Sequence, residues 1–307
     1  MTTVDTQFST REVPWMKLGK LEETPKTAAE AMALAKLDFT VSKQPAGYLG
    51  TDGKWHRSDH RVAVVRDDTG DAYEFVSPDY ELFQYSEAFD FMDTIDPNIV
   101  AAGSLKGGRQ AFMVVQPDHS SFTVGGDDSH DLYAILRTSH DRSRAIEVTL
   151  MALRHKCMNQ LTLRSFSRDA KYRWSIPHTR SAREKLIQAQ QVMVQLDAYT
   201  TEFQHLAERL MRSRPEEDTV RSILAKHVTP WAKKQDEVLD IILHLWHENE
   251  EQVGFNDTSW GVVSAVSEYF DWGRSRGTPE SRFLNALQGV THNTINRVTK
   301  ELLELTA

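Results

Sequence analysis

A basic segment in the middle of the chain carries the side chains best suited to binding a polyanion. Between residues 137 and 185, twelve Lys or Arg residues accompany four Asp or Glu residues, which gives a local net charge of +8 in a chain whose total is −8. Phe166, Tyr172, Trp174 and His178 are interleaved with these cations. Cations neutralise phosphates and aromatic rings stack on exposed bases. The segment therefore predicts contact with a nucleic acid.

Ten side chains are the candidate nucleic-acid contacts: Arg142, Arg144, Arg154, Lys156, Arg168, Lys171, Arg173 and Trp174, with Lys106 and Arg109 as secondary contacts. Alternate residues of a strand share a face, which would make Arg142 project with Arg144 and Arg154 with Lys156. The residues from Arg168 to Trp174 fall in a predicted loop. A second interpretation stays open, in which the arginines pair with acidic groups of the same protein.

Other residue patterns that could carry chemistry favour structural roles. His244 and His247 lie one helical turn apart beside Glu248, a spacing that could hold a metal ion, but no third ligand is evident and a packed helix is the better interpretation. Cys157 is interpreted as a buried structural thiol, because a histidine two residues away rarely acts as its base. We expect no metal site.

A nuclease would need clustered carboxylates to hold a divalent metal. The nearest candidates are Asp67-Asp68 and Asp127-Asp128, both beside glycines in turn-like contexts, and we interpret them as solvated turn carboxylates. The sequence thus predicts no catalytic residue, no cofactor and no enzyme activity.

Length and composition predict two folded domains. The chain has 307 residues, and its 40% hydrophobic and 26% charged residues are typical of globular proteins. A single cysteine and the lack of a signal-like start favour the cytoplasm, and no apolar run approaches the roughly 20 residues of a membrane-spanning helix. We expect residues 1–180 to form an α+β core and residues 181–307 a helical domain.

The first half of the chain is predicted to be mostly β. After a polar leader, a helix over residues 28–37 has Thr27 as N-cap, and a short helix is capped by Ser86. Lys106-Gly107-Gly108-Arg109 is a turn that joins two strands in a hairpin. An extended segment opens at residues 39–41, and a turn at Asp52-Gly53 leads into the next strand. The further predicted strands cover residues 60–66, 72–76, 99–105, 110–116, 122–124, 132–138 and 145–153.

The last third of the chain is predicted to be helical. Residues 181–213 form one long amphipathic helix whose apolar stripe favours burial against other helices over a free coiled coil, and self-association stays open. Further helices are predicted over residues 219–226, 235–250, 260–272 and 291–305.

Several segments resemble a phage/plasmid-like protein family defined by a domain of unknown function. The segments that carry the resemblance are Trp15 with Leu18-Gly19, residues 27–31, Asp38-Phe39-Thr40-Val41, residues 103–109, Ser139-His140-Asp141, Arg154 with Cys157 and Asn159, residues 174–179, Ser259-Trp260-Gly261 and Glu268-Tyr269. Arg142 stands where the family pattern would have glycine, and Met158 precedes the asparagine. The resemblance spans most of the chain and names no activity.

The order of helix, three strands, helix and further strands is similar to the core of single-strand annealing proteins of the Rad, RecT and Redβ type. That resemblance implies a homo-oligomeric ring or filament that holds single-stranded DNA in a basic groove without metal or nucleotide. We therefore expect a phage-encoded protein that anneals single strands in recombination or replication, in the host cytoplasm and away from membranes. The alternative is a phage protein-binding module that modulates a host enzyme.

Overall fold

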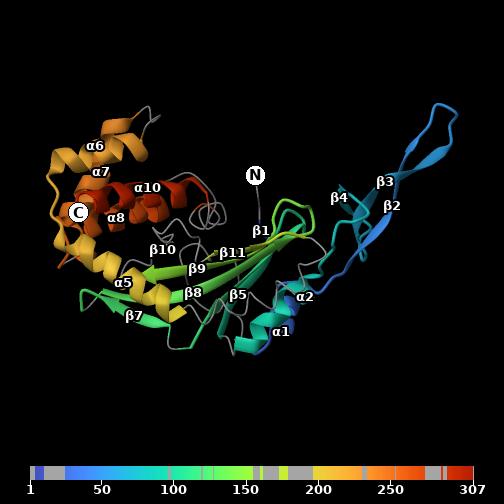
Figure 1. Cartoon of the computed structure of the whole chain (residues 1–307), viewed down its shortest axis with the longest axis horizontal. Coiled ribbons are helices and arrows are strands. Elements are labelled where there is room, and N and C mark those ends of the chain that lie inside the picture. Colours follow the sequence, from blue (N-terminus) through green and yellow to red (C-terminus); the bar gives the residue numbers. More distant parts are fainter. Residues whose placement is uncertain are drawn as a thin grey trace.

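The computed structural model describes twelve stretches of the chain: residues 4–9, 25–95, 98–118, 120–126, 128–154, 160–161, 173–178, 196–229, 234–252, 254–273, 285 and 289–306. The fold is α+β, as the sequence predicts: antiparallel sheets with short helices come first and helices follow (Figure 1).

A large antiparallel sheet forms the centre of the molecule. Its main path is β1-β5-β6-β8-β9-β10, while β7 pairs with β8 and β11 pairs with β9. The strands are β1 (Val4–Ser9), β5 (Asn98–Leu105), β6 (Gln110–Gln116), β7 (Ser121–Val124), β8 (Asp128–Ser139), β9 (Ile146–Arg154), β10 (Gln160–Leu161) and β11 (Arg173–Ile176).

Two strands of this sheet depart from the sequence predictions. β1 lies in the stretch predicted as a polar leader, and β11 covers Arg173 and Trp174, which were predicted to lie in a loop. Both strands pair with long neighbours: β1 with β5, and β11 with β9 from Arg173 opposite Thr149 to Ile176 opposite Ile146. Their hydrogen bonds come from partners distant in sequence, so their own residue patterns gave little signal.

The central strands are buried on both faces. Every residue of β6 is buried, and so is every residue of β9. Ala111, Met113 and Val115 belong to the main hydrophobic core on one face, whereas Phe112 and Val114 belong to a second cluster on the other. Strands that are buried on both faces have continuous runs of apolar residues in the sequence. For this reason the sequence predicted the positions of β6 and β9 accurately.

A smaller sheet contains β2 (Val41–Leu49), β3 (Trp55–Arg66) and β4 (Ala72–Val76). β3 pairs with β2 from Arg66 opposite Val41 to Trp55 opposite Leu49, whereas β4 reaches only the segment from Val62 to Val65. The outer part of the β2–β3 hairpin therefore projects from the molecule (Figure 1). The sequence predicts an extended segment that opens at 39–41, a turn at Asp52-Gly53 and a strand at 60–66. The structure confirms the turn, where Gly53 has a φ angle of 72°, and begins the second strand earlier, at Trp55.

Short helices pack beside the sheets. α1 (Ala28–Leu34) begins at Thr27, whose hydroxyl accepts a hydrogen bond from the Glu30 N–H at 3.2 Å, as predicted. α2 (Tyr85–Phe89) begins at Gln84 and not at Ser86, because Gln84 and Glu87 form a reciprocal capping box. A 3₁₀ turn, η1 (Asp90–Ile95), follows α2.

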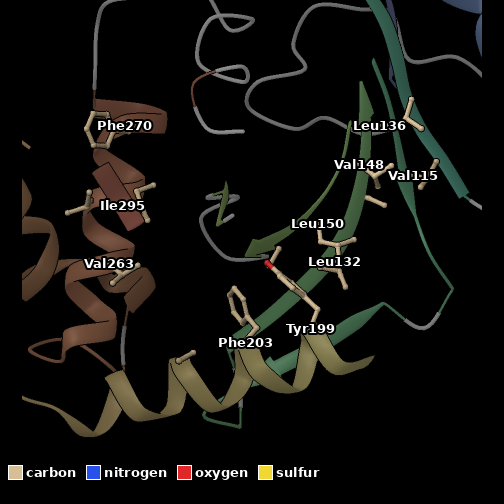
Figure 2. Packing of buried hydrophobic residues seen from close by; sticks show 14 of the residues in the cluster. Val115, Leu132, Leu136, Val148, Leu150, Tyr199, Phe203, Val263, Phe270 and Ile295 are labelled. Carbon is tan, nitrogen blue, oxygen red and sulfur yellow. The ribbon is translucent and has the colours of Figure 1, made fainter. Parts of the chain in front are cut away.

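The C-terminal third contributes helices to the same hydrophobic core. They are α5 (Leu196–Arg212), α6 (Glu217–His227), α7 (Gln235–Glu248), η2 (Glu250–Gln252), α8 (Ser259–Glu268), the π-helical turn η3 (Tyr269–Gly273) and α10 (Val290–Glu304). Tyr199 and Phe203 of α5 point toward Leu132 and Leu150 of the sheet (Figure 2). The predicted domain boundary at 180 and the predicted helical residues 181–195 lie outside the described residues.

A buried ion pair joins the sheet to these helices. Asp128, the first residue of β8, accepts a hydrogen bond from Arg154 Nε at 2.5 Å and one from the Trp260 indole N–H of α8 at 3.3 Å. The side chains of Asp128 and Arg154 are 1% and 0% exposed, and the guanidinium lies 4.5 Å from the centre of the Phe255 ring. This pair is called the Asp128–Arg154 hub below.

The hub corrects two predictions. Arg154 was a candidate phosphate contact, but its guanidinium is enclosed and neutralised by a carboxylate of the same chain, as the second interpretation of the basic segment proposed. Asp128 was interpreted as a solvated turn carboxylate, but it is buried. We therefore exclude Arg154 from the candidate nucleic-acid contacts.

Removing one partner of the hub should destabilise the fold strongly. Asp128→Ala leaves the Arg154 charge buried without its carboxylate, which costs about 3–5 kcal/mol in comparable pairs. Urea denaturation should show this loss in the free energy of unfolding. The control is Glu208→Ala, which removes an exposed partner of Arg212 and should change stability by less than about 1 kcal/mol. Equal effects of the two substitutions would contradict this account of the hub.

Candidate nucleic-acid interface

Two basic turns meet at one end of the large sheet. The turn at residues 106–109 joins β5 to β6, and the turn at residues 140–145 joins β8 to β9. β6 lies between β5 and β8, so Gln110 is opposite both Leu105 and Ser139. The N–H of His140 donates to the Arg109 carbonyl at 2.8 Å. The two turns thus form one surface.

Four of the ten predicted contacts lie on this surface: Lys106, Arg109, Arg142 and Arg144, named here the basic turn cluster. Lys106 and Arg142 are exposed. Arg109 is half-buried, with its guanidinium 5.1 Å from the centre of the Tyr73 ring, and it donates to the carbonyls of Lys106 and Ala72. Arg142 and Arg144 lie in a turn, so the predicted sharing of a strand face does not apply to them.

The remaining predicted contacts lie elsewhere or outside the described residues. Arg154 is at the opposite end of β9, roughly 25 Å from the turns at about 3.3 Å per residue. Trp174 is half-buried in β11 and packs against the hydrophobic core. The backbone of Arg173 lies in β11. The predicted contacts outside the described residues are Lys156, Arg168 and Lys171.

The backbone of both turns requires left-handed conformations. Lys106, Gly107, Gly108 and Arg142 have φ angles of 57°, 70°, 81° and 58°. A Cβ atom at Gly108 would lie 2.8 Å from the Tyr73 hydroxyl oxygen, so a side chain there would displace its neighbours. The φ angle at Arg142 falls in a region that glycine adopts without steric cost, which agrees with the glycine expected there from the resemblance.

Aromatic side chains support the two turns from beneath. The Tyr73 hydroxyl donates to the Gly107 carbonyl at 2.9 Å and the Tyr85 hydroxyl donates to the Gly108 carbonyl at 2.7 Å. His140 stacks on Tyr85 with ring centres 3.9 Å apart, and Phe39 meets His140 edge-on at 6.2 Å. Burial raises the pKa of Tyr85 well above its ordinary value. The two tyrosine hydroxyls thus bind the backbone of the 106–109 turn, and Tyr85 packs against the first residue of the other turn.

His140 is neutral at physiological pH. It is 1% exposed, and neither ring nitrogen has a hydrogen-bond partner among the described residues. Burial, with a smaller contribution from the nearby His178, lowers the pKa of His140 to about 3. His140 therefore supports the turn as an uncharged ring, and the positive charge of the surface comes from Lys and Arg.

Two further groups border the basic turn cluster, and neither was predicted as a contact. Arg66 lies 3.7 Å from the centre of the Phe39 ring and pairs with Asp68 at 2.6 Å. His178 stacks on Tyr80 with ring centres 5.2 Å apart, and burial lowers the pKa of His178. Arg66 gave no sequence signal because it is separated by 40 residues from the turn that it approaches.

Other candidate chemistry is not supported by the geometry. The Nδ1 atom of His247 lies 2.5 Å from a carboxylate oxygen of Asp257, and His244 is exposed on α7. Within the part of the chain that is described, no group of three or more His, Cys, Asp or Glu residues could hold a metal ion. Asp67 accepts hydrogen bonds from Thr40 and Ser42. Cys157 and Asp127 lie outside the described residues.

These features define an α+β protein with an extended antiparallel sheet and a basic surface at one end of its strands. A family model described as Domain of unknown function (DUF932) matches residues 72–300. The match covers most of the chain, so the chain belongs to this family, as its sequence motifs predicted. Comparison with curated proteins and with solved structures finds no match. Among the described residues, no helix is long and apolar enough to cross a membrane.

Six of the motif segments of the resemblance contribute to two places in the fold. Phe39, the turn at 106–109, His140 and His178 meet around the basic turn cluster. Arg154 and Trp260 meet at Asp128. Segments far apart in sequence therefore build one surface and one buried hub.

The left-handed conformation at residue 142 can be tested by stability. Arg142→Gly should raise the free energy of unfolding by up to about 1 kcal/mol, because it removes a steric cost of roughly 1–2 kcal/mol and adds unfolded-chain entropy. Arg142→Ala keeps the strain and should be close to neutral. Urea denaturation of both variants measures the difference, and an alanine variant more stable than the glycine variant would contradict the assigned conformation.

Acid should destabilise the fold through His140. Its pKa is about 3 in the folded state against 6.5 ordinarily. As pH falls below about 6.5 the unfolded chain gains a proton that the folded chain does not bind, so stability decreases by up to about 1.4 kcal/mol per pH unit. His140→Phe should reduce this slope between about pH 6 and about pH 4. An unchanged slope in denaturation curves would show that His140 is not buried as described.

Proposed function

We propose that the chain binds single-stranded DNA through the basic turn cluster and promotes annealing of complementary strands without bond chemistry. The observation that supports this most is the meeting of two basic turns, from separate segments of the sequence, at one end of the large sheet. Such a surface would bind a polyanion by neutralising phosphates, in a chain whose net charge is otherwise negative.

The chemistry of the cluster favours backbone contacts over base recognition. Lys106 and Arg142 are exposed at the tips of their turns, whereas Tyr73, Tyr85 and His140 beneath them are buried. The buried rings fix the cations in place but offer no free face to a base. Affinity would therefore come from phosphate contacts and be independent of sequence, as an annealing protein requires.

The relation to annealing proteins rests on the order of elements: a helix, antiparallel strands, a helix, then further strands. This is an analogy of architecture, and one fold can serve many functions. A phage origin and a role in recombination or replication in the host cytoplasm belong to the same proposal. A protein-binding module that modulates a host enzyme is the alternative, and the acidic helices α6 and α7 offer it a surface.

The proposal is tested by binding of a fluorescent single-stranded oligonucleotide across a salt series. The double variant Lys106→Gly, Arg142→Gly removes two exposed cations while suiting the left-handed backbone at both positions. Each lost phosphate contact should reduce the slope of log K against log salt by about 0.7, so the slope should decrease by about 1.4.

The matched control is the double variant Arg212→Ala, Lys234→Ala, which removes two side chains that are 81% and 75% exposed at the helical end. It should bind like the unmodified protein. Equal weakening in both variants would indicate nonspecific attraction, and no binding at low salt would refute the proposal and favour a protein partner.

A further inference from the structure

The β2–β3 hairpin forms an arm that projects from the molecule and carries exposed aromatic rings. Residues 45–61, named here the arm, extend as a two-stranded ribbon beyond the segment of β3 that pairs with β4 (Figure 1). Tyr48 and Trp55 of the arm are 65% and 56% exposed. In the described part of the chain, Phe75 of β4 is the one other Phe, Tyr or Trp residue that is exposed. Exposed rings are therefore concentrated on the arm.

The Trp55 indole lies against the backbone of the opposite strand. A Cβ atom at Gly47 would lie 2.5 Å and 2.6 Å from two carbon atoms of this indole, so the ring occupies the space that a side chain at Gly47 would fill. The indole is still 56% exposed, so much of its ring surface is open to solvent. Trp55 is thus supported from one side and accessible from the other.

A second ring is supported on the other face of the arm. Tyr48 lies opposite His56 in the ladder, between the pairs that Gly47 and Trp55 make, and successive pairs of a ladder alternate between the two faces. Tyr48 and His56 stack with ring centres 5.5 Å apart. The Nε2 atom of His56 lies 3.0 Å from a carboxylate oxygen of Asp52, which holds the imidazole in place. Each face of the ribbon therefore presents one exposed aromatic ring.

Three cations lie among these rings. Lys54, Arg57 and Arg61 are exposed, and their side chains make no ion pair with another described residue. Arg57 is directly opposite Gly47, the residue that the Trp55 indole covers, so the guanidinium and the indole share one face. Residues 45–61 contain these three cations and two Asp residues, in a chain whose net charge is −8. The arm is therefore a locally basic part of an acidic protein.

Exposed rings beside unpaired cations fit a single-stranded nucleic acid. Rings stack on unpaired bases whatever their sequence, and cations neutralise the phosphates between them. The basic turn cluster offers cations but no open ring, because Tyr73, Tyr85 and His140 are buried beneath its turns. The arm supplies the ring surface that this cluster lacks.

The arm is also continuous with the basic turn cluster. Arg66, which borders that cluster, is the last residue of β3 and pairs with Val41, the first residue of β2. From Val41 to Leu49, β2 spans about 26 Å at about 3.3 Å per residue. One strand of several nucleotides can therefore contact the cluster and the arm together.

We propose that the arm is a second nucleic-acid site, which binds unpaired bases of single-stranded DNA. Trp55 and Tyr48 stack on the bases, and Arg57 neutralises an adjoining phosphate. This inference rests on the proposed function in requiring that the chain binds single-stranded DNA, and it adds base contacts that the basic turn cluster does not make. The alternative occupant is an apolar protein surface, because Leu49 is 72% exposed opposite Trp55. The unpaired cations favour the polyanion.

The test measures, at low salt, the binding of two fluorescent oligonucleotides of equal length. One consists of thymidine nucleotides, and the other of abasic nucleotides that keep the phosphates but have no bases. Trp55→Leu, which removes the ring and keeps an apolar side chain, should weaken binding of the thymidine oligonucleotide roughly 5- to 150-fold, the contribution of one stacked base. Binding of the abasic oligonucleotide should not change. Tyr48→Leu should show the same pattern, whereas Trp55→Phe keeps a ring and should retain most of the affinity.

Two further variants separate this proposal from the proposed function. The double variant Lys106→Gly, Arg142→Gly removes phosphate contacts of the basic turn cluster and should weaken binding of both oligonucleotides. Phe75→Leu changes a 53% exposed ring of β4 outside the arm and should bind both oligonucleotides like the unmodified protein. A loss that depends on bases is thus assigned to the arm, and a loss that does not is assigned to the cluster.

Three results overturn the arm proposal and leave the proposed function in place. In the first, Trp55→Leu and Tyr48→Leu bind the thymidine oligonucleotide like the unmodified protein, which would assign the rings to a protein partner. In the second, folded leucine variants lose affinity equally for both oligonucleotides. In the third, Trp55→Phe loses as much affinity as Trp55→Leu. An unmodified protein that binds neither oligonucleotide overturns both proposals. Circular dichroism shows whether each variant is folded, and Tyr48→Leu decides the outcome where Trp55→Leu is not.

Discussion

The buried ion pair between Asp128 and Arg154 is the constraint on which the arrangement of sheet and helices depends. A charge enclosed in a protein interior is tolerated only when its partner and its remaining hydrogen bonds are supplied. Asp128 begins β8, Arg154 ends β9, and the Trp260 indole of α8 donates to the same carboxylate. The pair therefore fixes the register at this end of the sheet and ties the helical third of the chain to it.

At the opposite end of β8 and β9, charged side chains are exposed instead of buried. There the cations Lys106 and Arg142 are exposed and the rings beneath them are buried. The sheet thus places two arginines of the basic segment in opposite surroundings. Arg154 is buried in an ion pair, whereas Arg142 is exposed. Net charge alone could not distinguish them, because it counts both equally.

The sequence by itself determined the α+β class, the central strands, the Thr27 cap, the glycine turn and the family, because each depends on local pattern. Continuous apolar runs locate β6 and β9 without knowledge of their partners. Tertiary structure decided which basic residues are buried, which turns meet, and that β1 and β11 are strands. It also decided that the β2–β3 hairpin projects. These features depend on pairing between distant residues, as between Asp128 and Arg154 or the turns at 106–109 and 140–145, and local pattern does not encode the partner.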